Sequence, residues 1–268
     1  NDAPELVPRF MAVVFRDVTV QPSPLWLQCQ LVAMGGKPIN NIVDATNYIM
    51  LMTAQPTHAY DYDKLRGHEL EARMAHNGEK VSLLNGKEYE LTTGGADTEV
   101  SDSTKNIVLE CANFDMYALR RTAMRHGIFT DALTRFNKGQ SPLQNAAVLK
   151  QLMSMVGGVQ ASQVFDLKQF SDELDDYFDG KYTPANIDID SKFINERLGL
   201  DLSGDDICGL LNNVEIKSHG PEEELDYICI QSPFWRTDLE LPEDIVEEVG
   251  RLYGFDKLSR QLPMRSIK

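Results

Sequence analysis

The chain has 268 residues, of which 42% are hydrophobic and 25% are charged, so it is long enough for one large globular domain or for a large and a small one. Its net charge of −15 argues against a general nucleic-acid-binding protein, because phosphate contacts need lysine and arginine. No apolar run approaches the length of a membrane span, and no basic segment leads into a hydrophobic core at the start, so we expect no membrane association and no signal peptide.

The first predicted elements are a strand and a helix. Residues 8–20 are rich in β-branched and aromatic side chains and alternate weakly, which predicts a strand. Residues 23–34 open with Ser23 and Pro24, the order expected of a capping residue and a proline at the first helical position, and two glycines follow them. We therefore predict a helix over residues 23–34 that Ser23 caps.

The stretch from residue 39 to residue 61 is too polar for a plain core element. Polar side chains interrupt an apolar run there, and a single histidine, His58, follows soon after a proline. Asp44, Asn47 and Tyr48 fall at helical spacings of three and four, so one turn presents an acid, an amide and a phenol together. The pattern predicts the floor of a site. It also fits a capped helix and a turn whose polar side chains are satisfied locally.

The middle of the chain alternates between strand and helix signals. Strands are predicted over residues 70–75, 80–84 and 87–91. Asn85 and Gly86 predict a tight hairpin turn between the last two of these strands. Helices are predicted over residues 114–124 and 145–156, and a strand that closes the sheet over residues 164–170.

An acidic segment marks the predicted domain boundary. Residues 171–180 carry five acids and no base, and Pro184 follows shortly after. We therefore expect two domains, residues 1–180 and 181–268. In the second, strands are predicted over 187–189 and 227–231, and helices over 192–198, 203–211 (capped by Ser203) and 242–252. The fold class expected is α+β: a mixed or antiparallel sheet with packed helices, then a small winged-helix-like domain.

The predicted helix that begins near residue 114 opens a basic region in this acidic chain. Between Met116 and Gly139 the only acid is Asp131, whereas the bases, with one histidine, are Arg120, Arg121, Arg125, Arg135, Lys138 and His126. Such a cluster indicates an anion-binding patch. It also fits a solvated helix face whose charges pair with acids elsewhere in the fold.

A second cluster is acidic. Asp244, Glu247 and Glu248 lie at i, i+3 and i+4, and Asp238 precedes them by six residues. Grouped carboxylates suit a hard cation such as Mg²⁺, and they equally suit an acidic first helical turn favoured by the helix dipole. The cysteines, in contrast, show no C-x-x-C spacing, which favours reduced thiols and a cytoplasmic protein over a zinc site or disulfides: Cys29, Cys111, Cys208 and Cys229.

Several motifs, in order along the whole chain, resemble one family. They are Asn40-Asn-Ile-Val-Asp-Ala-Thr-Asn-Tyr-Ile-Met50, Gln55-Pro-Thr-His-Ala-Tyr-Asp61, Leu109-Glu-Cys-Ala112, Arg120-Arg-Thr122, Thr130-Asp-Ala132, Trp235-Arg-Thr-Asp238, Glu243-Asp-Ile-Val-Glu-Glu248 and Arg251-Leu-Tyr-Gly254. These motifs are similar to those of the β subunit of bacterial phenylalanyl-tRNA synthetase, over its editing domain and the small domain that follows. The chain departs from the family before Gly94, where relatives carry a longer segment with at least one more strand, and at Leu133 and Asn137.

The resemblance implies post-transfer editing, the hydrolysis of tyrosine wrongly attached to tRNA(Phe). By resemblance Glu110 accepts the hydrogen bond of the tyrosine hydroxyl, Thr130 and Ala132 line the pocket, and His58 and Asn47 contact the ester, its water or the terminal adenosine. Gly94 and Gly95 let backbone amides approach the substrate. Arg120, Arg121 and Arg125 are the tRNA-binding candidates. Without the resemblance, Glu110 is better explained as a salt-bridged glutamate at a strand end.

The same resemblance implies partners. The aminoacylation site and its ATP belong to the α subunit of an α2β2 enzyme, and that subunit completes the magnesium site at Asp238, Asp244, Glu247 and Glu248. An alternative is an assembly or tRNA-docking module that has lost editing, which the shortened segment before Gly94 favours. A third option, a stand-alone nucleic-acid-binding winged helix, is disfavoured because the predicted helix over 242–252 is acidic.

Overall fold

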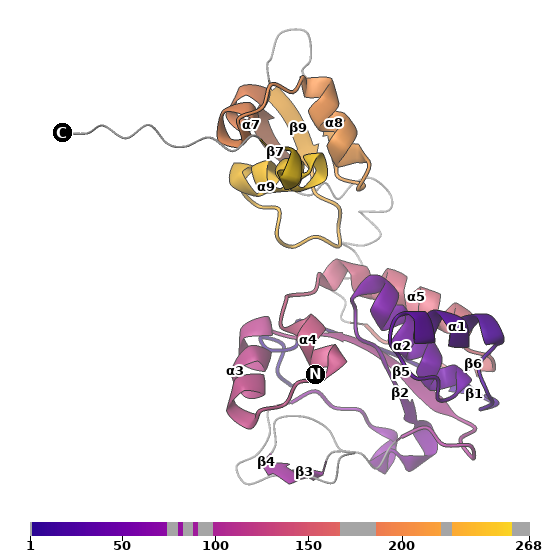
Figure 1. Ribbon diagram of the computed structural model, residues 1–268. Helices are drawn as coiled ribbons and strands as arrows, with labels where there is room; N and C mark the ends of the chain where they lie inside the picture. The colour runs from indigo at the N-terminus through magenta and orange to yellow at the C-terminus, as the bar shows by residue number, and fades with distance from the viewer. Residues whose placement is uncertain are drawn as a thin grey trace. The chain divides into compact units, whose positions relative to one another are not determined.

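The computed structural model describes residues 2–73, 80–82, 88–90, 99–166, 186–220 and 227–258 (Figure 1). The chain forms two compact units, Asn1–Asp176 and Tyr177–Lys268, called unit 1 and unit 2 below. The boundary predicted near residue 180 lies outside the described residues. Within the described ranges, no helix combines the length and the apolar character that crossing a bilayer requires.

Unit 1 is built on a four-stranded sheet in the order β2-β5-β1-β6, with every neighbouring pair antiparallel. The strands are β1 (Arg9–Arg16), β2 (His58–Asp61), β5 (Ile107–Asn113) and β6 (Val159–Gln160). Because β5 lies between β1 and β2, its side chains are flanked on both sides, and all seven of its residues are buried.

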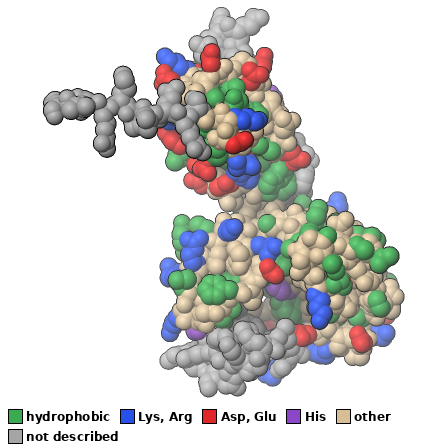
Figure 2. All heavy atoms as spheres, in the orientation of Figure 1, with side chains coloured by type: hydrophobic (Ala, Val, Ile, Leu, Met, Phe, Trp, Pro, Cys, Tyr) green, Lys and Arg blue, Asp and Glu red, His purple; other side chains and the backbone are tan. Residues whose placement is uncertain are grey.

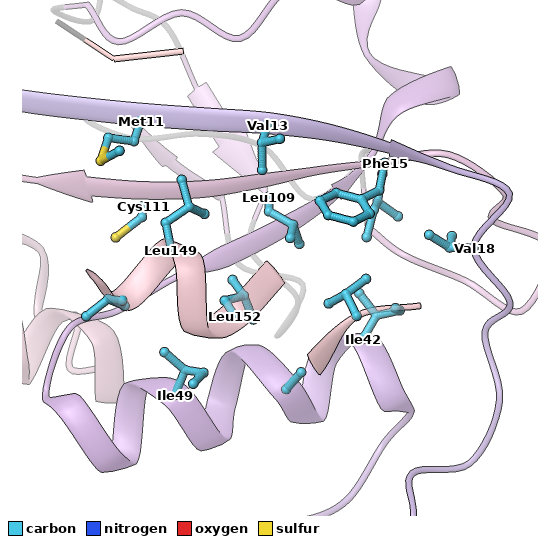
Figure 3. Packing of buried hydrophobic residues seen from close by; sticks show 14 residues of the cluster. Met11, Val13, Phe15, Val18, Ile42, Ile49, Leu109, Cys111, Leu149 and Leu152 are labelled. Atoms are coloured by element: carbon cyan, nitrogen blue, oxygen red, sulfur yellow. The ribbon is translucent and has the colours of Figure 1, made fainter. Parts of the chain in front are cut away.

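Helices α1 (Leu25–Ala33), α2 (Asn41–Thr53) and α5 (Asn145–Met155) belong to the same unit. Figure 3 shows Leu109 of β5 and Val13 of β1 among side chains of α2 and α5, such as Ile49 and Leu152. Side chains alternate between the faces of a strand, so Glu110 points to the opposite face. Burying each such Leu or Ile side chain stabilises the fold by about 1.5–3 kcal/mol. The core therefore fixes β5, and with it the position of Glu110.

Asp44 on α2 has a structural role. Its side chain is fully buried and accepts hydrogen bonds from the Ser23 hydroxyl and from the backbone N–H of Ile39 at 2.7 Å. Asn40 caps α2 by accepting from the N–H groups of residues 42 and 43. Ser23 therefore does not cap α1 as predicted. Pro24 occupies the N-cap position there, without a side-chain cap, because Ser23 is engaged by Asp44.

Two described α-helices lie between β5 and α5 in the sequence of unit 1. The predicted helix is α3 (Met116–His126), which Asp115 caps and which ends at Gly127 with φ +63°. The second, α4 (Asp131–Phe136), has only six residues and was not predicted. Its Phe136 is buried and packs edge-on against Phe114, with ring centroids 4.9 Å apart. Packing of this residue, rather than helix propensity, explains why so short a helix forms.

Four strand predictions in the middle of the chain can be compared with the structure. Strands β3 (Lys80–Ser82) and β4 (Glu88–Glu90) pair antiparallel as predicted, while the turn at Asn85-Gly86 lies outside the described residues. The strand predicted over 70–75 is wrong in its described part, since residues 70–73 belong to no strand. Over 164–170, the described residues contribute only a bridge between Phe165 and Ala12, and β6 supplies the edge strand instead.

Unit 2 has a three-stranded antiparallel sheet in the order β7-β9-β8. Its strands are β7 (Asn186–Asp190), β8 (Lys217–His219) and β9 (Tyr227–Gln231), and its helices are α7 (Ser191–Leu198), α8 (Gly204–Asn212) and α9 (Pro242–Tyr253). The capping box of Ser203 and Asp206 confirms the predicted start of α8. Short 3₁₀ helices complete the two units at Tyr62–Lys64, Arg66–His68, Pro142–Gln144 and Phe255–Lys257. The α+β class is confirmed, with antiparallel sheets.

Candidate functional site

Glu110 and His58 form the centre of the candidate site. They lie directly opposite each other on β5 and β2, and His58 Nδ1 is 2.9 Å from Glu110 Oε2. The glutamate side chain is 4% exposed, whereas 42% of the histidine side chain is exposed. The sheet thus holds a carboxylate in the interior and a more accessible imidazole beside it.

Tyr60 is the next residue of β2 on the same face. Its hydroxyl donates to the same oxygen, Glu110 Oε2, over 3.5 Å, a long and weak hydrogen bond. The second oxygen, Glu110 Oε1, is buried and has no hydrogen-bond partner among the described residues. Leaving a buried acceptor unsatisfied costs about 1–3 kcal/mol, and more for a charged group. The arrangement therefore suits a ligand that brings one donor to Oε1.

Electrostatics assign the donors and the acceptor. Burial favours the neutral imidazole, but the hydrogen bond to Glu110 and its charge outweigh burial and raise the pKa of His58 above 6.5. Burial, together with the same carboxylate, raises the pKa of Tyr60 far above its ordinary value, so Tyr60 stays a neutral phenol. Both neighbours can therefore donate, and Glu110 is the acceptor of the cluster.

The other predicted pocket residues lie on different elements. Asn47 is half-buried on α2, a helix whose buried side packs on the sheet face opposite to Glu110. Thr130 is the N-cap of α4, where its hydroxyl accepts from the N–H of Leu133 at 3.1 Å, and Ala132 lies half-buried in the first turn. Among the described residues, no hydrogen bond or ion pair joins these three residues to Glu110. Gly94 and Gly95 lie outside the described residues.

The basic residues of α3 are on the surface. Arg120, Arg121 and Arg125 are exposed, and Arg120 Nη2 donates to the carbonyl of Asn137 at 2.8 Å. Large hydrophobic side chains are exposed on and beside this helix: Tyr117 (57%), Met124 (73%) and Phe129 (72%). Figure 2 shows lysine and arginine side chains gathered on the left of unit 1, where α3 lies in Figure 1. The surface combines cations with apolar and aromatic groups.

The acidic cluster of unit 2 is engaged by two arginines. Arg236 binds both oxygens of Asp238, at 2.6 and 2.8 Å, and also donates a hydrogen bond to Glu248. Arg251, three residues after Glu248 on α9, donates to Glu248 as well. Hydrogen bonds from Arg236 lower the pKa of Asp238. Burial opposes ionisation of Glu248, but hydrogen bonds from Arg251 and Arg236 outweigh it and lower the pKa of that carboxyl too.

The remaining acids do not complete a metal site. Asp244 accepts from the backbone N–H groups of residues 240 and 241, at 3.0 and 2.7 Å, and Glu247 is exposed. In the described part of the chain, no group of three or more His, Cys, Asp or Glu side chains could hold a metal ion. Because guanidinium groups already satisfy Asp238 and Glu248, the four predicted ligands do not fit Mg²⁺ as a set, and no chemical step is assigned to the metal.

Sequence reasoning missed three residues of these clusters: Tyr60, Arg236 and Arg251. A signal existed for Tyr60, because residues i and i+2 of a strand share a face and His58-Ala-Tyr60 has that spacing. A signal also existed for Arg251, which stands at i+3 from Glu248 on a helix. Only the fold brings Arg236, twelve residues away, to the same carboxylate.

In comparisons with known proteins, two domain families match separate parts of the chain. The B3/4 domain family matches residues 6–94 and 92–161, and the tRNA synthetase B5 domain family matches residues 187–255. The phenylalanine–tRNA ligase β subunit of Latilactobacillus sakei is 35% identical over 286 residues, 97% of this chain and 34% of that protein. The same subunits from Moorella thermoacetica (35% over 285 residues, 97% and 34%) and Geobacillus kaustophilus (33% over 294 residues, 100% and 34%) are also similar. The chain spans about a third of the length of these curated relatives.

This chain is also similar to the solved structure of an N-terminal fragment of the phenylalanyl-tRNA synthetase β subunit from Pyrococcus horikoshii. It covers 94% of this chain, and this chain covers 72% of it, with 12% identity and a TM-score of 0.38.

Proposed function

The chain belongs to the family of phenylalanine–tRNA ligase β subunits, of which it carries the B3/4 and B5 domains, and from this premise we propose that unit 1 hydrolyses tyrosine wrongly attached to tRNA(Phe). One observation carries the proposal: Glu110 Oε1 is buried and lacks a partner among the described residues, while His58 and Tyr60 hold the other oxygen. A phenol is a donor that suits such an acceptor.

The discrimination required is between tyrosine and phenylalanine, which differ by one hydroxyl. An apolar synthetic pocket rejects an added hydroxyl only by about a hundredfold, so a second site that rewards the hydroxyl improves accuracy. A hydrogen bond to an ionised acceptor contributes about 1.5–3 kcal/mol, which corresponds to roughly ten- to a hundredfold in affinity. Glu110 supplies that preference, because it binds the hydroxyl that phenylalanine lacks.

Hydrolysis itself needs little chemistry from the protein. The aminoacyl ester is already activated, so holding the ester and orienting a water accounts for much of the acceleration. In this proposal His58, with 42% of its side chain exposed beside Glu110, contacts the ester or its water. The resemblance adds Asn47 as a contact of the ester or the terminal adenosine, Thr130 and Ala132 as the lining of the ring pocket, and Gly94 and Gly95 as backbone donors. The roles of these last five residues rest on the family resemblance and not on contacts in the structure.

The exposed arginines of α3 provide the RNA contact in this proposal. Arg121 and Arg125 form no ion pair within the described part of the chain and can bind the phosphates next to the mischarged 3′ end. The α subunit, absent from this chain, would carry the ATP-dependent aminoacylation. Its contacts with the chain, the α2β2 assembly and a cytoplasmic location are parts of the same proposal.

Deacylation by the intact synthetase tests the proposal. We expect Glu110→Gln to slow hydrolysis of Tyr-tRNA(Phe) by about ten- to a hundredfold, because a neutral amide is a weaker acceptor in the same shape. Glu69→Gln, at an exposed position, should leave the rate unchanged. Hydrolysis that is indifferent to Glu110 would instead favour the alternative, a tRNA-docking module without editing.

A further inference from the structure

Three side chains form one row across the sheet on the Glu110 face. His58 on β2 and Ala12 on β1 are the direct partners of Glu110 on its two sides. Directly opposite residues of adjacent strands share a face, and their Cβ atoms lie about 4.5–5.5 Å apart. The carboxylate is therefore flanked by an imidazole on one side and by a single methyl group on the other.

The two oxygens of Glu110 differ in their hydrogen-bond partners because the neighbouring strands differ. On the β2 side, His58 and Tyr60 both reach Oε2. On the β1 side, Ala12 can neither donate a hydrogen bond nor extend over the carboxylate, and Oε1 is the oxygen without a partner among the described residues. Ala12 thus leaves the buried oxygen Oε1 without a hydrogen-bond partner on this side of the strand.

The neighbours of Ala12 on the same face of β1 are apolar. Phe10 and Val14 lie two residues to either side of Ala12 on β1, so they share its face. Phe10 is buried, whereas Ala12 and Val14 are partly exposed, which shows that this part of the sheet face can be reached. Apolar side chains of this kind favour contact with an aromatic ring.

The position of Ala12 is rigid. Its strand pairs with β5 on one side, and on the other side Ala12 and Phe165 exchange two backbone hydrogen bonds of 3.1 and 2.8 Å. Because both edges of the backbone are held, a larger side chain at this position cannot move away from Glu110 by shifting the strand.

We propose that Ala12 determines specificity in this site: its small side chain admits the aromatic ring of the tyrosyl group to the free oxygen of Glu110. The proposal rests on the function proposed above and adds a residue to it. A larger side chain at position 12 fills the space that the ring needs, while the carboxylate and its two donors stay in place.

A size series at position 12 of the intact synthetase is the test. Ala12→Gly and Ala12→Ser should hydrolyse Tyr-tRNA(Phe) within about threefold of wild type, whereas Ala12→Val and Ala12→Leu should lose about ten- and a hundredfold in kcat/KM, mainly through KM. Ala161→Leu, an equal enlargement at an exposed residue whose N–H bonds to Val14, is the matched control. A graded loss with size at position 12 alone is the expected result, and equal rates across the series would overturn the proposal.

A binding measurement separates this proposal from the function on which it rests. Free tyrosine is titrated against the wild-type, Ala12→Leu and Glu110→Gln proteins, with no tRNA present. Loss of binding in both variants supports the role of Ala12 even where hydrolysis is absent. Binding that needs Glu110 but tolerates leucine at position 12 overturns the role of Ala12 and leaves the proposed function standing. If wild type does not bind tyrosine, both proposals fail.

Discussion

His58 and Glu110, 52 residues apart in the sequence, meet at 2.9 Å because the register of β2 and β5 places them directly opposite each other. The contact fixes one carboxylate oxygen, and the other is buried without a hydrogen-bond partner among the described residues. A buried carboxylate next to an accessible imidazole is a recurring arrangement at functional sites, and here the sheet itself produces it.

The contact predicts a pH-dependent contribution of His58 to stability. Its pKa is raised above 6.5 in the fold, so the contribution is fully present below about pH 6.5 and is lost as the pH rises through the folded-state value. It amounts to about 1 kcal/mol or less, since 42% of the side chain is exposed. Urea unfolding of wild type and His58→Gln should give a difference that shrinks with rising pH. A difference that grows would contradict the assignment, and His219→Gln, at an exposed site, is the control.

Thr130 is predicted to act as a helix cap whether or not it also lines a pocket. Its hydroxyl accepts from the N–H of Leu133 at the start of α4, so Thr130→Ala should lower the free energy of unfolding by about 1 kcal/mol. Thr130→Ser keeps the acceptor and should keep the stability. Denaturant titrations of the two variants measure this, and equal destabilisation by serine and alanine would show that the methyl group, not the cap, matters.

The exposed arginines of α3 are predicted to bind RNA phosphates. Replacing Arg121 and Arg125 with glutamine should weaken tRNA binding and reduce the slope of log K against log salt by about 0.7–0.9 for each phosphate that the protein no longer neutralises. Arg16→Gln removes an exposed arginine at the end of β1 and should leave the slope unchanged. An unchanged slope in the α3 variant would place the RNA elsewhere.

The arginine contacts of Glu248 predict that the acidic cluster stabilises unit 2 without a metal. Glu248→Gln should cost about 1–3 kcal/mol, because Arg236 and Arg251 lose an ionised acceptor. Since the pKa values of Asp238 and Glu248 are lowered, this stabilisation is present above their unfolded-state values and is lost as the pH falls through the folded-state ones. Urea unfolding of wild type and Glu248→Gln at neutral and acidic pH measures both effects.

Magnesium provides the control for that prediction. Millimolar Mg²⁺ should leave the unfolding temperature of the chain unchanged, and Glu247→Gln, at an exposed neighbouring position, should behave as wild type. A Mg²⁺-dependent rise that Glu248→Gln abolishes would show that the metal displaces the arginines.

Elements with strong local signals could be predicted from the sequence, and short ones could not. Helix α9 and strand β9 agree with their predicted ranges, because a proline start, a glycine end and an apolar β-branched run are local features. The three-residue β8 and the six-residue α4 were missed, since packing and pairing decide such short elements. The strand predicted at 70–75 shows the converse error: its composition favours a strand, but no described strand pairs with residues 70–73.

The same distinction between local signals and contacts that depend on the fold holds for the residues of the candidate site. Spacing could place Asp44 and Tyr48 near one another on a helix, but it could not show that Asp44 is buried and satisfied by Ser23. The pairing of His58 with Glu110 depends on strand register across 52 residues, which periodicity does not encode. The acids of α9 have metal-like spacing, and only the fold reveals the guanidinium group of Arg236 beside them.

A structure of the chain with bound tyrosine, or with a non-hydrolysable tyrosyl-adenosine, tests the central claim most directly. The account predicts that the phenol oxygen lies within hydrogen-bond distance, about 2.5–3.0 Å, of Glu110 Oε1 on the Ala12 side, with His58 still on Oε2. A tyrosine bound with its hydroxyl directed away from Glu110, or bound only outside the sheet face that β1, β2 and β5 form, would contradict it.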